Sequence, residues 1–573
     1  MKTILGDTTE SAESRSELAE ISSPSPPLTG RTLAAIGAAA FAAEIPFFFL
    51  GTPSGHDFEF HLYSWLEVLA QWKQGILYPR WAALAHFGYG EPRFVFYPPA
   101  SWELGALLSA IFPWKIASSI YIWIALVLAG ISMFALARRW LNRRDATFAA
   151  VLYAVNPYHL VIVYWRSAFA ELLASCLVPL LLLLLLRVAN GERRVVVSLS
   201  LLLAAAWLTN APAAVMIHYS LALLLVCFAW QRRSPRLLAT GAAAVGLGAC
   251  LSAFYLLPAI YEQRWVNIAE AVSAGSTPAD NFLFIHTADA DHDAFNRIIS
   301  WIAMLEIMLT LATAWAAGKS RALRPRLWSV LCAWGVVCSL LLFSMTRVLW
   351  QLLPKLEFMQ FPWRWLLCLS VVLSIFVTVG ARHWWMRMAI CLVALSTIGA
   401  LWTRIQAPWW DTAADLKEMR DNVLDGIGYE GTDEYTPVGA DPTAIDKGAA
   451  KVRVDGAAES AIHISGWDAE SKSFTAQMSA PGQLVVRLFS DPAWKVEVNG
   501  RAIETAQLEG TGQMLIPVEA GMNHVQITFT RTWDRIVGGW ISFSVAICVL
   551  VWVWMARHRE RSTTQDTKVH KGI

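Results

Sequence analysis

Long runs of apolar residues dominate this chain from about residue 31 to residue 556. Two of them, Ile116–Ala137 and Trp540–Met555, carry no charged side chain. A helix needs roughly 20 residues to cross the hydrocarbon core of a bilayer, and most of the runs approach that length. The runs are continuous rather than alternating, and in lipid only helices or closed barrels satisfy the backbone, so we predict membrane-spanning helices.

Short clusters of arginine and lysine separate the runs and set the direction of the predicted spans. Basic loops stay on the cytoplasmic side of a membrane. The clusters lie at 138–144, 187–194, 232–236, 319–326, 382–387 and 557–561. With all of them in the cytoplasm, the chain has about 12 spans, at 31–51, 116–138, 146–164, 171–189, 195–210, 213–230, 237–257, 298–317, 327–345, 363–381, 388–404 and 535–556.

This topology places both termini in the cytoplasm and four longer regions outside the cell membrane. These regions are 52–99, 258–297, 346–362 and 405–534. The apolar stretch Ala100–Phe112 is too short for a comfortable span, and we interpret it as a re-entrant or interfacial helix. The polar, Ser- and Pro-containing residues 1–30 predict a disordered cytoplasmic tail, and residues 557–573 a basic cytoplasmic tail.

The segment 405–534 has a different pattern from the rest of the chain. Its second half alternates between apolar and polar residues, as in Trp494–Val498 and Val525–Phe529, which predicts strands. Asn499-Gly500 is a two-residue hairpin signal. The fold class that follows is an α-helical polytopic membrane protein with a small extracytoplasmic antiparallel β-sandwich before the last helix.

Composition narrows the functional classes. The chain has 573 residues, of which 56% are hydrophobic and 16% charged, and its net charge of +2 gives no reason to expect a nucleic-acid partner. All eight cysteines fall inside apolar runs without metal-type spacing, and we interpret them as small buried residues. The β domain contains none and must hold together without disulfides.

The first outer region, 52–99, holds the densest candidate chemistry. His56, Asp57, Glu59 and His61 lie within six residues, ahead of an amphipathic pattern that predicts a helix lying on the membrane surface. Such a group can deprotonate a hydroxyl or bind a divalent cation. The alternative is a polar loop that is merely solvated; the density of titratable groups favours a functional role. The spacing is not diagnostic of a metal.

Several arginines fall on the same predicted outer side: Arg80, Arg93, Arg166 and Arg364. Each has three explanations, which are snorkelling to the membrane surface, pairing with an acid such as Glu171 or Glu357, or binding a phosphate. Four of them on one side indicate an anionic lipid substrate. We also predict that Tyr97 and Glu171 bind the substrate.

The motifs together resemble a known family. Gly-His-Asp-x-x-Phe-His at 55–61, Tyr-Pro-Arg-Trp at 78–81, Gly-Tyr-Gly at 88–90 and Phe-Tyr-Pro-Pro at 96–99 are similar to bacterial membrane proteins named 6-pyruvoyl-tetrahydropterin synthase-related. Tyr-Trp-Arg-Ser-Ala-Phe-Ala-Glu at 164–171, Thr-Asn-Ala-Pro at 209–212, Leu-Pro at 257–258 and Phe-Pro-Trp-Arg at 361–364 extend the resemblance over most of the chain. No zinc-type histidine triad of a soluble pterin synthase is visible.

The layout also resembles GT-C integral-membrane glycosyltransferases, whose first outer loop carries an acidic motif and whose donor is usually a sugar on a polyprenyl phosphate. This resemblance implies that Asp57 is the acidic-motif residue and Glu59 its companion. The sequence reads His-Asp-x-Glu instead of Asp-x-Asp, which leaves metal dependence open. It also implies a multi-pass protein of the bacterial inner membrane.

The resulting hypothesis is an enzyme that moves a sugar from a polyprenyl-phosphate donor to an envelope glycan or lipid acceptor on the outer face of the membrane. Asp57 acts as the base, and the arginines hold the donor phosphate. The alternative is a non-enzymatic transporter or flippase of lipid-linked sugars, which uses the arginines without needing Asp57. The absence of an obvious internal repeat favours the enzyme.

Overall fold

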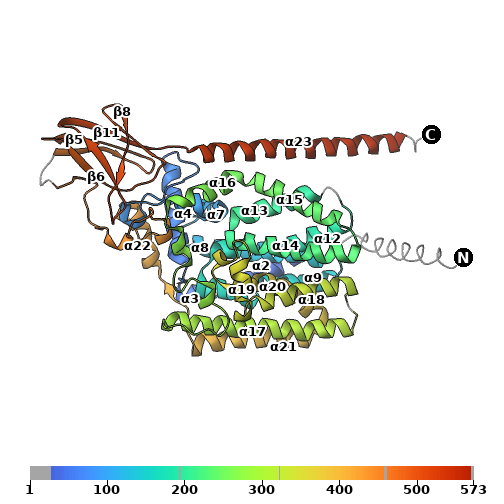
Figure 1. Cartoon of the computed structure of the whole chain (residues 1–573). Coiled ribbons are helices and arrows are strands. Elements are labelled where there is room, and N and C mark those ends of the chain that lie inside the picture. Colours follow the sequence, from blue (N-terminus) through green and yellow to red (C-terminus); the bar gives the residue numbers. More distant parts are fainter. Residues whose placement is uncertain (1–26, 193–194, 322, 457–460, 570–573) are drawn as a thin grey trace.

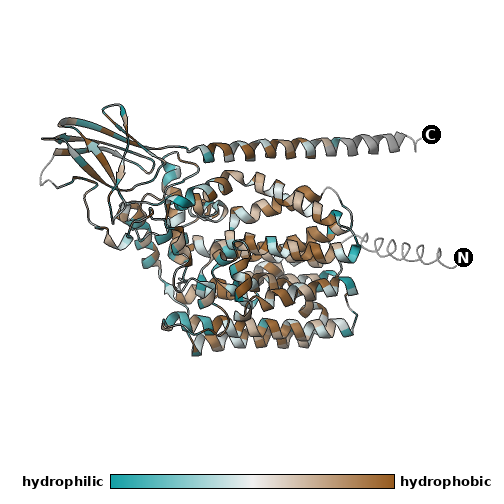
Figure 2. Cartoon of the chain, in the orientation of Figure 1, coloured by the Kyte–Doolittle hydropathy of each residue, from teal (hydrophilic) through white to brown (hydrophobic). Residues whose placement is uncertain are grey.

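The computed structural model describes residues 27–192, 195–321, 323–456 and 461–569, and it is mostly helical. Among these residues, nine helical segments are long and apolar enough to cross a membrane. Two further pairs of helices qualify only as bent units, which gives up to eleven spans. The nine are Gly30–Leu50, Trp114–Ala137, Arg143–Arg166, Phe169–Ala189, Ala211–Arg232, Ala290–Lys319, Pro362–Gly380, Trp384–Arg404 and Trp533–Met555. Figure 2 shows that brown, apolar residues predominate in the helical bundle.

The helices themselves are often shorter than these segments. They are α2 (Gly30–Ala43), α3 (Phe47–Leu50), α8 (Trp114–Ala137), α9 (Arg143–Ala154), α10 (Pro157–Val161), α11 (Phe169–Ala174), α12 (Leu177–Ala189), α13 (Val195–Thr209), α14 (Ala211–Arg232), α15 (Arg236–Leu251), α16 (Ala253–Glu262), α17 (Ala290–Lys319), α18 (Pro325–Leu340), α19 (Arg347–Leu352), α20 (Leu366–Gly380), α21 (Trp384–Arg404) and α23 (Trp533–Val569). Every predicted span therefore falls on helix, although α13 is shorter than a typical span.

Two predicted spans are not straight. The stretch predicted at 237–257 is bent by 78° where α15 meets α16, and the one at 327–345 is bent by 94° between α18 and the helical segment Ser344–Leu352, which includes α19. At the first bend the Ser252 hydroxyl donates to the Gly248 carbonyl, a local bond that competes with the helical ladder. At the second, Phe343 adopts an extended backbone with φ −105° and ψ 146°. Apolar composition alone does not reveal either break.

The loops that carry basic clusters meet at one end of the helical bundle. Arg387 Nη1 lies 2.7 Å from Asp145 Oδ1, and Arg382 Nη2 donates to the Ser320 carbonyl over 3.1 Å. Thr32, near the start of α2, hydrogen-bonds Thr147 at the same end. We call this end the basic end. The far end of α23 also points that way in Figure 1.

The four regions predicted to lie outside meet at the opposite end, which we call the β-side end. Strand β1 (Thr52–Pro53) pairs with β2 (Trp410–Asp411), which joins the first region to the last. The side-chain amide of Gln360 donates to the Ala271 carbonyl over 2.6 Å. This bond joins the third region, 346–362, to the second, 258–297. Figure 1 shows the larger sheets beyond this end, with α23 running back along the bundle.

Two antiparallel sheets form the β region and share one hydrophobic core. Their strand orders are β3-β6-β10-β9 and β4-β5-β11-β7-β8. The strands are β3 (Val452–Val454), β4 (Ala461–Trp467), β5 (Ser471–Met478), β6 (Gly482–Phe489), β7 (Trp494–Val498), β8 (Arg501–Ile503), β9 (Ala506–Gln507), β10 (Gln513–Val518) and β11 (Gly521–Phe529). The predicted hairpin is confirmed: Asn499 and Gly500 have φ of 53° and 77° and join β7 to β8.

Two boundaries differ from the prediction. Strands of the two larger sheets begin only at Val452, because the residues before them form α22 (Ala413–Leu424) and loops that pack on the helical end. Helix α23 continues to Val569 instead of ending near 556. The predicted disordered tail falls almost entirely on residues 1–26, outside the described part.

The helix predicted to lie on the membrane surface is α4 (Phe58–Lys73), and other helices of the protein cover much of it. Ten of its residues are buried, including Glu67 and Gln71, because α7 (Pro99–Ile111) and α22 pack against it. Residues 100–112, left over in the prediction, correspond to α7, which packs on α4 and on α8. The short helices α5 (Ala85–Gly88) and α6 (Arg93–Phe96) complete the first region. Trp81 and Tyr89 from this region enter the core of the β region.

Candidate functional site

Close backbone contact fixes Asp57 against the end of a membrane helix. A Cβ on Gly55 would lie 2.4 Å from the Trp165 carbonyl oxygen, so only glycine allows this approach. The Asp57 amide then donates to the Arg166 carbonyl over 2.8 Å. The helix ends here in a π-helical turn (η2, Ile162–Arg166), and Ser167 has a left-handed φ of 50°. π-Turns and strained residues are frequent at functional sites.

A chain of ion pairs extends from Asp57 into the protein. Arg166 Nη2 lies 3.0 Å from Asp57 Oδ2, and its Nη1 lies 2.8 Å from Glu171 Oε2. Arg364 Nε lies 3.3 Å from the same Glu171 oxygen. The Tyr158 hydroxyl donates to the other Glu171 oxygen over 2.5 Å. We call these five residues the Asp57 cluster. Residues far apart in the sequence thus form one charged network.

Exposure within the cluster is uneven. The Asp57 side chain is 35% exposed, whereas those of Arg166 and Glu171 are 2% and 1% exposed. Asp57 is the N-cap residue of α4, but its side chain makes no capping hydrogen bond. Its Oδ1 has no hydrogen-bond partner in the described part of the chain. Asp57 is therefore the carboxylate of this network that a ligand can reach.

The surroundings keep Asp57 ionised. Burial alone would raise the pKa of Asp57, but the guanidinium of Arg166, helped by Arg364, holds it below its ordinary value. At neutral pH the side chain is therefore a fixed hydrogen-bond acceptor.

Aromatic rings surround the two arginines. The Arg166 guanidinium lies 4.8 Å from the centroid of Trp363, and that of Arg364 lies 4.7 Å from the centroid of Phe361. Arg364 Nη1 donates to the Met359 carbonyl over 2.8 Å. Its Nη2 makes no hydrogen bond to any residue that the structure describes. Arg364 thus keeps a terminal donor that the protein does not use.

His61 and Tyr97 flank the reachable side of Asp57. His61 is 1% exposed, its ring centroid lies 5.7 Å from that of Tyr97, and its Nε2 has no hydrogen-bond partner. Burial lowers the pKa of His61 to about 4, so the ring is neutral at pH 7. Burial and the charge of Asp57 raise the pKa of Tyr97 well above its ordinary value, which keeps its hydroxyl protonated. His56 is exposed and packs edge-on against Phe295 at 5.0 Å.

Three of the predicted site residues lie elsewhere. Glu59 is exposed, and its charged neighbours are Asp411 and Glu430 instead of the arginines. Arg93 is buried, with its Nε 2.5 Å from Glu91 Oε1, so it neutralises an acid of its own loop.

Arg80 lies over the Tyr78 ring at 4.5 Å, and its charged neighbours are Arg535, Glu262 and Glu470. Arg80 and Arg93 are therefore each committed to their own surroundings, outside the Asp57 cluster. Arg166 and Arg364 do converge, and the predicted pairing of Arg364 with Glu171 is confirmed.

A divalent cation does not fit the residues at this site. Among the described residues no group of three or more His, Cys, Asp or Glu side chains could hold a metal ion. Asp57 already faces the Arg166 guanidinium, which occupies the side of the carboxylate where a cation would bind.

Sequence reasoning missed Tyr158 and the supporting role of the aromatic pair. Tyr158 follows Asn156-Pro157 in the middle of an apolar run, where nothing marks its hydroxyl as a partner of Glu171. Phe361 and Trp363 stack with ring centroids 4.8 Å apart and an interplanar angle of 6°. They lie in the motif at 361–364, which could have pointed to arginine–aromatic packing.

Comparison with solved structures finds an arabinofuranosyltransferase and an oligosaccharyltransferase. The arabinofuranosyltransferase AftD from mycobacteria is 19% identical, with a TM-score of 0.36 over 67% of this chain and 29% of that one. The Archaeoglobus fulgidus oligosaccharyltransferase, tethered with an acceptor peptide, is 13% identical, with a TM-score of 0.37 over 70% of this chain and 55% of that one. This chain thus spans less than a third of the first protein and about half of the second. No curated protein matches it significantly.

A family model matches the chain over residues 94–408, which is more than half of its length. The matched part contains Arg166, Glu171 and Arg364 and ends just before β2. The description of the model is "6-pyruvoyl-tetrahydropterin synthase related domain; membrane protein". The chain therefore belongs to this family of 6-pyruvoyl-tetrahydropterin synthase-related membrane proteins.

Proposed function

We propose that this protein is a membrane glycosyltransferase that moves a sugar from a lipid-phosphate donor to an acceptor hydroxyl at the β-side end of the bundle. The observation that carries the proposal is Asp57: a reachable, ionised carboxylate held by a buried arginine at the end of a membrane helix. An anionic lipid in the membrane and an acceptor in the water meet at such a boundary.

The cluster supplies a role for each reactant. Asp57 accepts the proton of the acceptor hydroxyl as the oxygen bonds to the anomeric carbon of the sugar and the bond from that carbon to the phosphate oxygen breaks, which inverts the configuration at this carbon. Arg364, with its unused terminal donor, stabilises the negative charge that builds on the leaving phosphate. Arg166 and Glu171 hold these two groups in position. Tyr97, with its protonated hydroxyl, is placed to donate a hydrogen bond to the sugar.

The donor we propose is a sugar carried on a polyprenyl phosphate, and the acceptor is a glycan or lipid of the cell envelope. The β-side end then faces the outside of a bacterial inner membrane. The clustering of the basic loops at the other end supports this orientation, since basic loops remain in the cytoplasm.

The transporter alternative also has an observation in its favour. The bends of 78° and 94° between α15 and α16 and between α18 and α19 are of the kind that transporters use to bind substrates. A transporter needs the arginines to hold a phosphate but needs no base. The two functions therefore differ in whether the bond between the sugar and the lipid phosphate is broken.

The test uses the purified full chain in liposomes with a mixture of polyprenyl-phosphate sugars extracted from the source membrane. The donors to be tested are chosen by comparing a deletion strain with wild type. Mass spectrometry of lipid-linked sugars and envelope glycans identifies the sugars that differ between them. Release of free polyprenyl phosphate together with a glycosylated acceptor supports the proposal. Movement of intact donor across the bilayer without release of polyprenyl phosphate would establish the transporter instead.

A further inference from the structure

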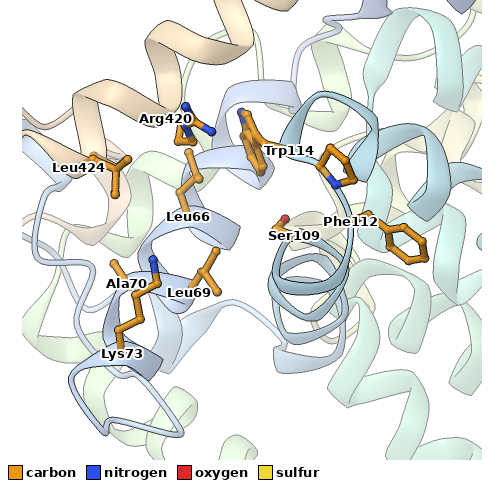
Figure 3. Close-up of a pocket in the computed structure, with 11 residues that line it drawn as sticks. Leu66, Leu69, Ala70, Lys73, Ser109, Phe112, Trp114, Arg420 and Leu424 are labelled. Carbon is orange, nitrogen blue, oxygen red and sulfur yellow. The ribbon is translucent and has the colours of Figure 1, made fainter.

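A pocket of about 350 Å³ lies on the β-side end, away from the N-terminus of α4 that carries Asp57. Its walls come from α4, the end of α7, the start of α8 and α22, and most of the side chains are apolar (Figure 3). The volume falls in the range of small-ligand sites, roughly 300–1,000 Å³. Leu66 and Ala70 form the floor on α4, and Phe112 and Leu424 flank it.

Two basic side chains border this apolar pocket. Lys73 is exposed and makes no hydrogen bond or ion pair with any described residue. The Arg420 side chain is 43% exposed, and its Nη2 lies 3.8 Å from Asp421 Oδ1, but its Nε is buried and has no hydrogen-bond partner among the described residues. A buried donor of a charged group is costly to leave unpaired. The negative end of the helix dipole accounts for the position of Lys73 in the last turn of α4. It does not account for the unpaired Nε of Arg420.

The pocket lies where the membrane surface meets the protein. Trp114, which lines it, is the first residue of the candidate span Trp114–Ala137. Tryptophan at the end of a span is typical of the headgroup level of a bilayer. Next to the pocket, Ile111 and Ile116 are 63% and 38% exposed, which gives an apolar path from the hydrocarbon core to the pocket.

We infer that this pocket binds an anionic phospholipid of the surrounding leaflet, with the phosphate between Lys73 and Arg420 and one acyl chain passing over Leu66 and Ala70. Basic side chains next to a membrane attract anionic lipids. The apolar floor makes the site specific for a lipid over a free anion. Because the pocket includes α4 and α22, a bound lipid fastens both helices to the membrane surface. The inference is independent of the proposed glycosyl transfer.

The experiment uses the full chain in nanodiscs of phosphatidylcholine with a minor share of phosphatidylglycerol. Native mass spectrometry then counts the phosphatidylglycerol molecules that stay bound. We expect retained phosphatidylglycerol on the wild type, a loss of about fivefold in apparent affinity for Lys73→Ala or Arg420→Ala, and about 25-fold for both together. Ala70→Trp fills the pocket without changing charge and should abolish retention.

Lys115→Ala is the matched control, because Lys115 is an exposed lysine beside Trp114 that does not line the pocket. It should retain phosphatidylglycerol like the wild type. Equal loss in Lys115→Ala would show general surface attraction and overturn the inference. Wild-type retention in Ala70→Trp would do so as well, and so would displacement of the lipid by inorganic phosphate.

Discussion

Replacing Asp57 by Asn tests the proposed base with little change in shape. The substitution removes one negative charge from the Asp57 cluster and keeps an oxygen that can accept from Arg166. Arg166 retains Glu171 at 2.8 Å as a charged partner. The variant therefore removes the base without leaving a buried guanidinium alone.

The structure sets the expected cost in stability. Removing one partner of a fully buried ion pair costs about 3–5 kcal/mol, and an exposed pair contributes about 0–1 kcal/mol. Asp57 is 35% exposed and its amide replacement still accepts a hydrogen bond, so we expect a loss of about 1–2 kcal/mol. Loss of a general base lowers the rate by about 10²–10⁴-fold. The effect on product should therefore exceed the effect on protein level.

The pKa of Asp57 adds a pH criterion. Because folding lowers this pKa, the contribution of Asp57 to stability is present above its ordinary pKa of 3.8 and is lost as the pH falls through the lowered value. Between about pH 5 and 8 the side chain stays charged. The difference in stability between wild type and Asp57→Asn should thus be constant over that range.

The assay measures product and membrane abundance in the same cells. A deletion strain carries wild type, Asp57→Asn or Glu59→Gln, which alters a carboxylate two residues away that does not contact the cluster. Product is quantified by mass spectrometry and protein by immunoblot. We expect normal abundance with no detectable product for Asp57→Asn, and less than about tenfold loss for Glu59→Gln. Full product from Asp57→Asn at normal abundance would show that Asp57 is not the base and would favour the transporter.

Three other predictions concern the donor, the topology and the β region. Arg364→Lys should raise KM for the donor more than it lowers kcat in a liposome assay, because an ammonium does not reproduce the fork of donors; an unchanged KM would contradict this. A reporter fused after Asn190 should report the cytoplasm and one after Gly431 the outside, and the opposite result at either fusion would reject the orientation. Residues 440–532 expressed alone should be β-rich by circular dichroism and unaffected by reducing agents, since they contain no cysteine; a helical spectrum would contradict the fold.

Patterns local in sequence predicted the fold well. Continuous apolar runs gave the helices because the bilayer requires them, and Asn499-Gly500 gave a hairpin because both residues tolerate positive φ. The bends at Ser252 and Phe343 stayed hidden, since they depend on a few backbone dihedrals within apolar sequence. The enclosure of α4 was also hidden. Its amphipathic pattern fits a membrane surface and a protein interior equally well.

The candidate site shows where sequence reasoning reaches its limit. Arg93 and Arg166 look alike in sequence, since each lies in an aromatic motif of a predicted outer loop. Glu91, two residues before Arg93, was the available signal that Arg93 already has a partner. The meeting of Arg166 with Arg364 around Glu171 depends on tertiary packing between distant helices. No local pattern contains that information.

The balance of charge in the Asp57 cluster gives the two arginines different roles at the proposed phosphate site. Both terminal nitrogens of Arg166 already face carboxylates, Asp57 on one side and Glu171 on the other. Arg166 therefore orients Asp57 and keeps it ionised. Its own charge is balanced by the two carboxylates and is not available to a ligand. Arg364 shares Glu171 only through Nε, and its other bond goes to a neutral carbonyl. The cluster is formally neutral, with two carboxylates and two guanidinium groups, and Arg364 is the group whose unused terminal donor is available to the proposed phosphate. The division of labour between the two arginines follows from this difference in their partners.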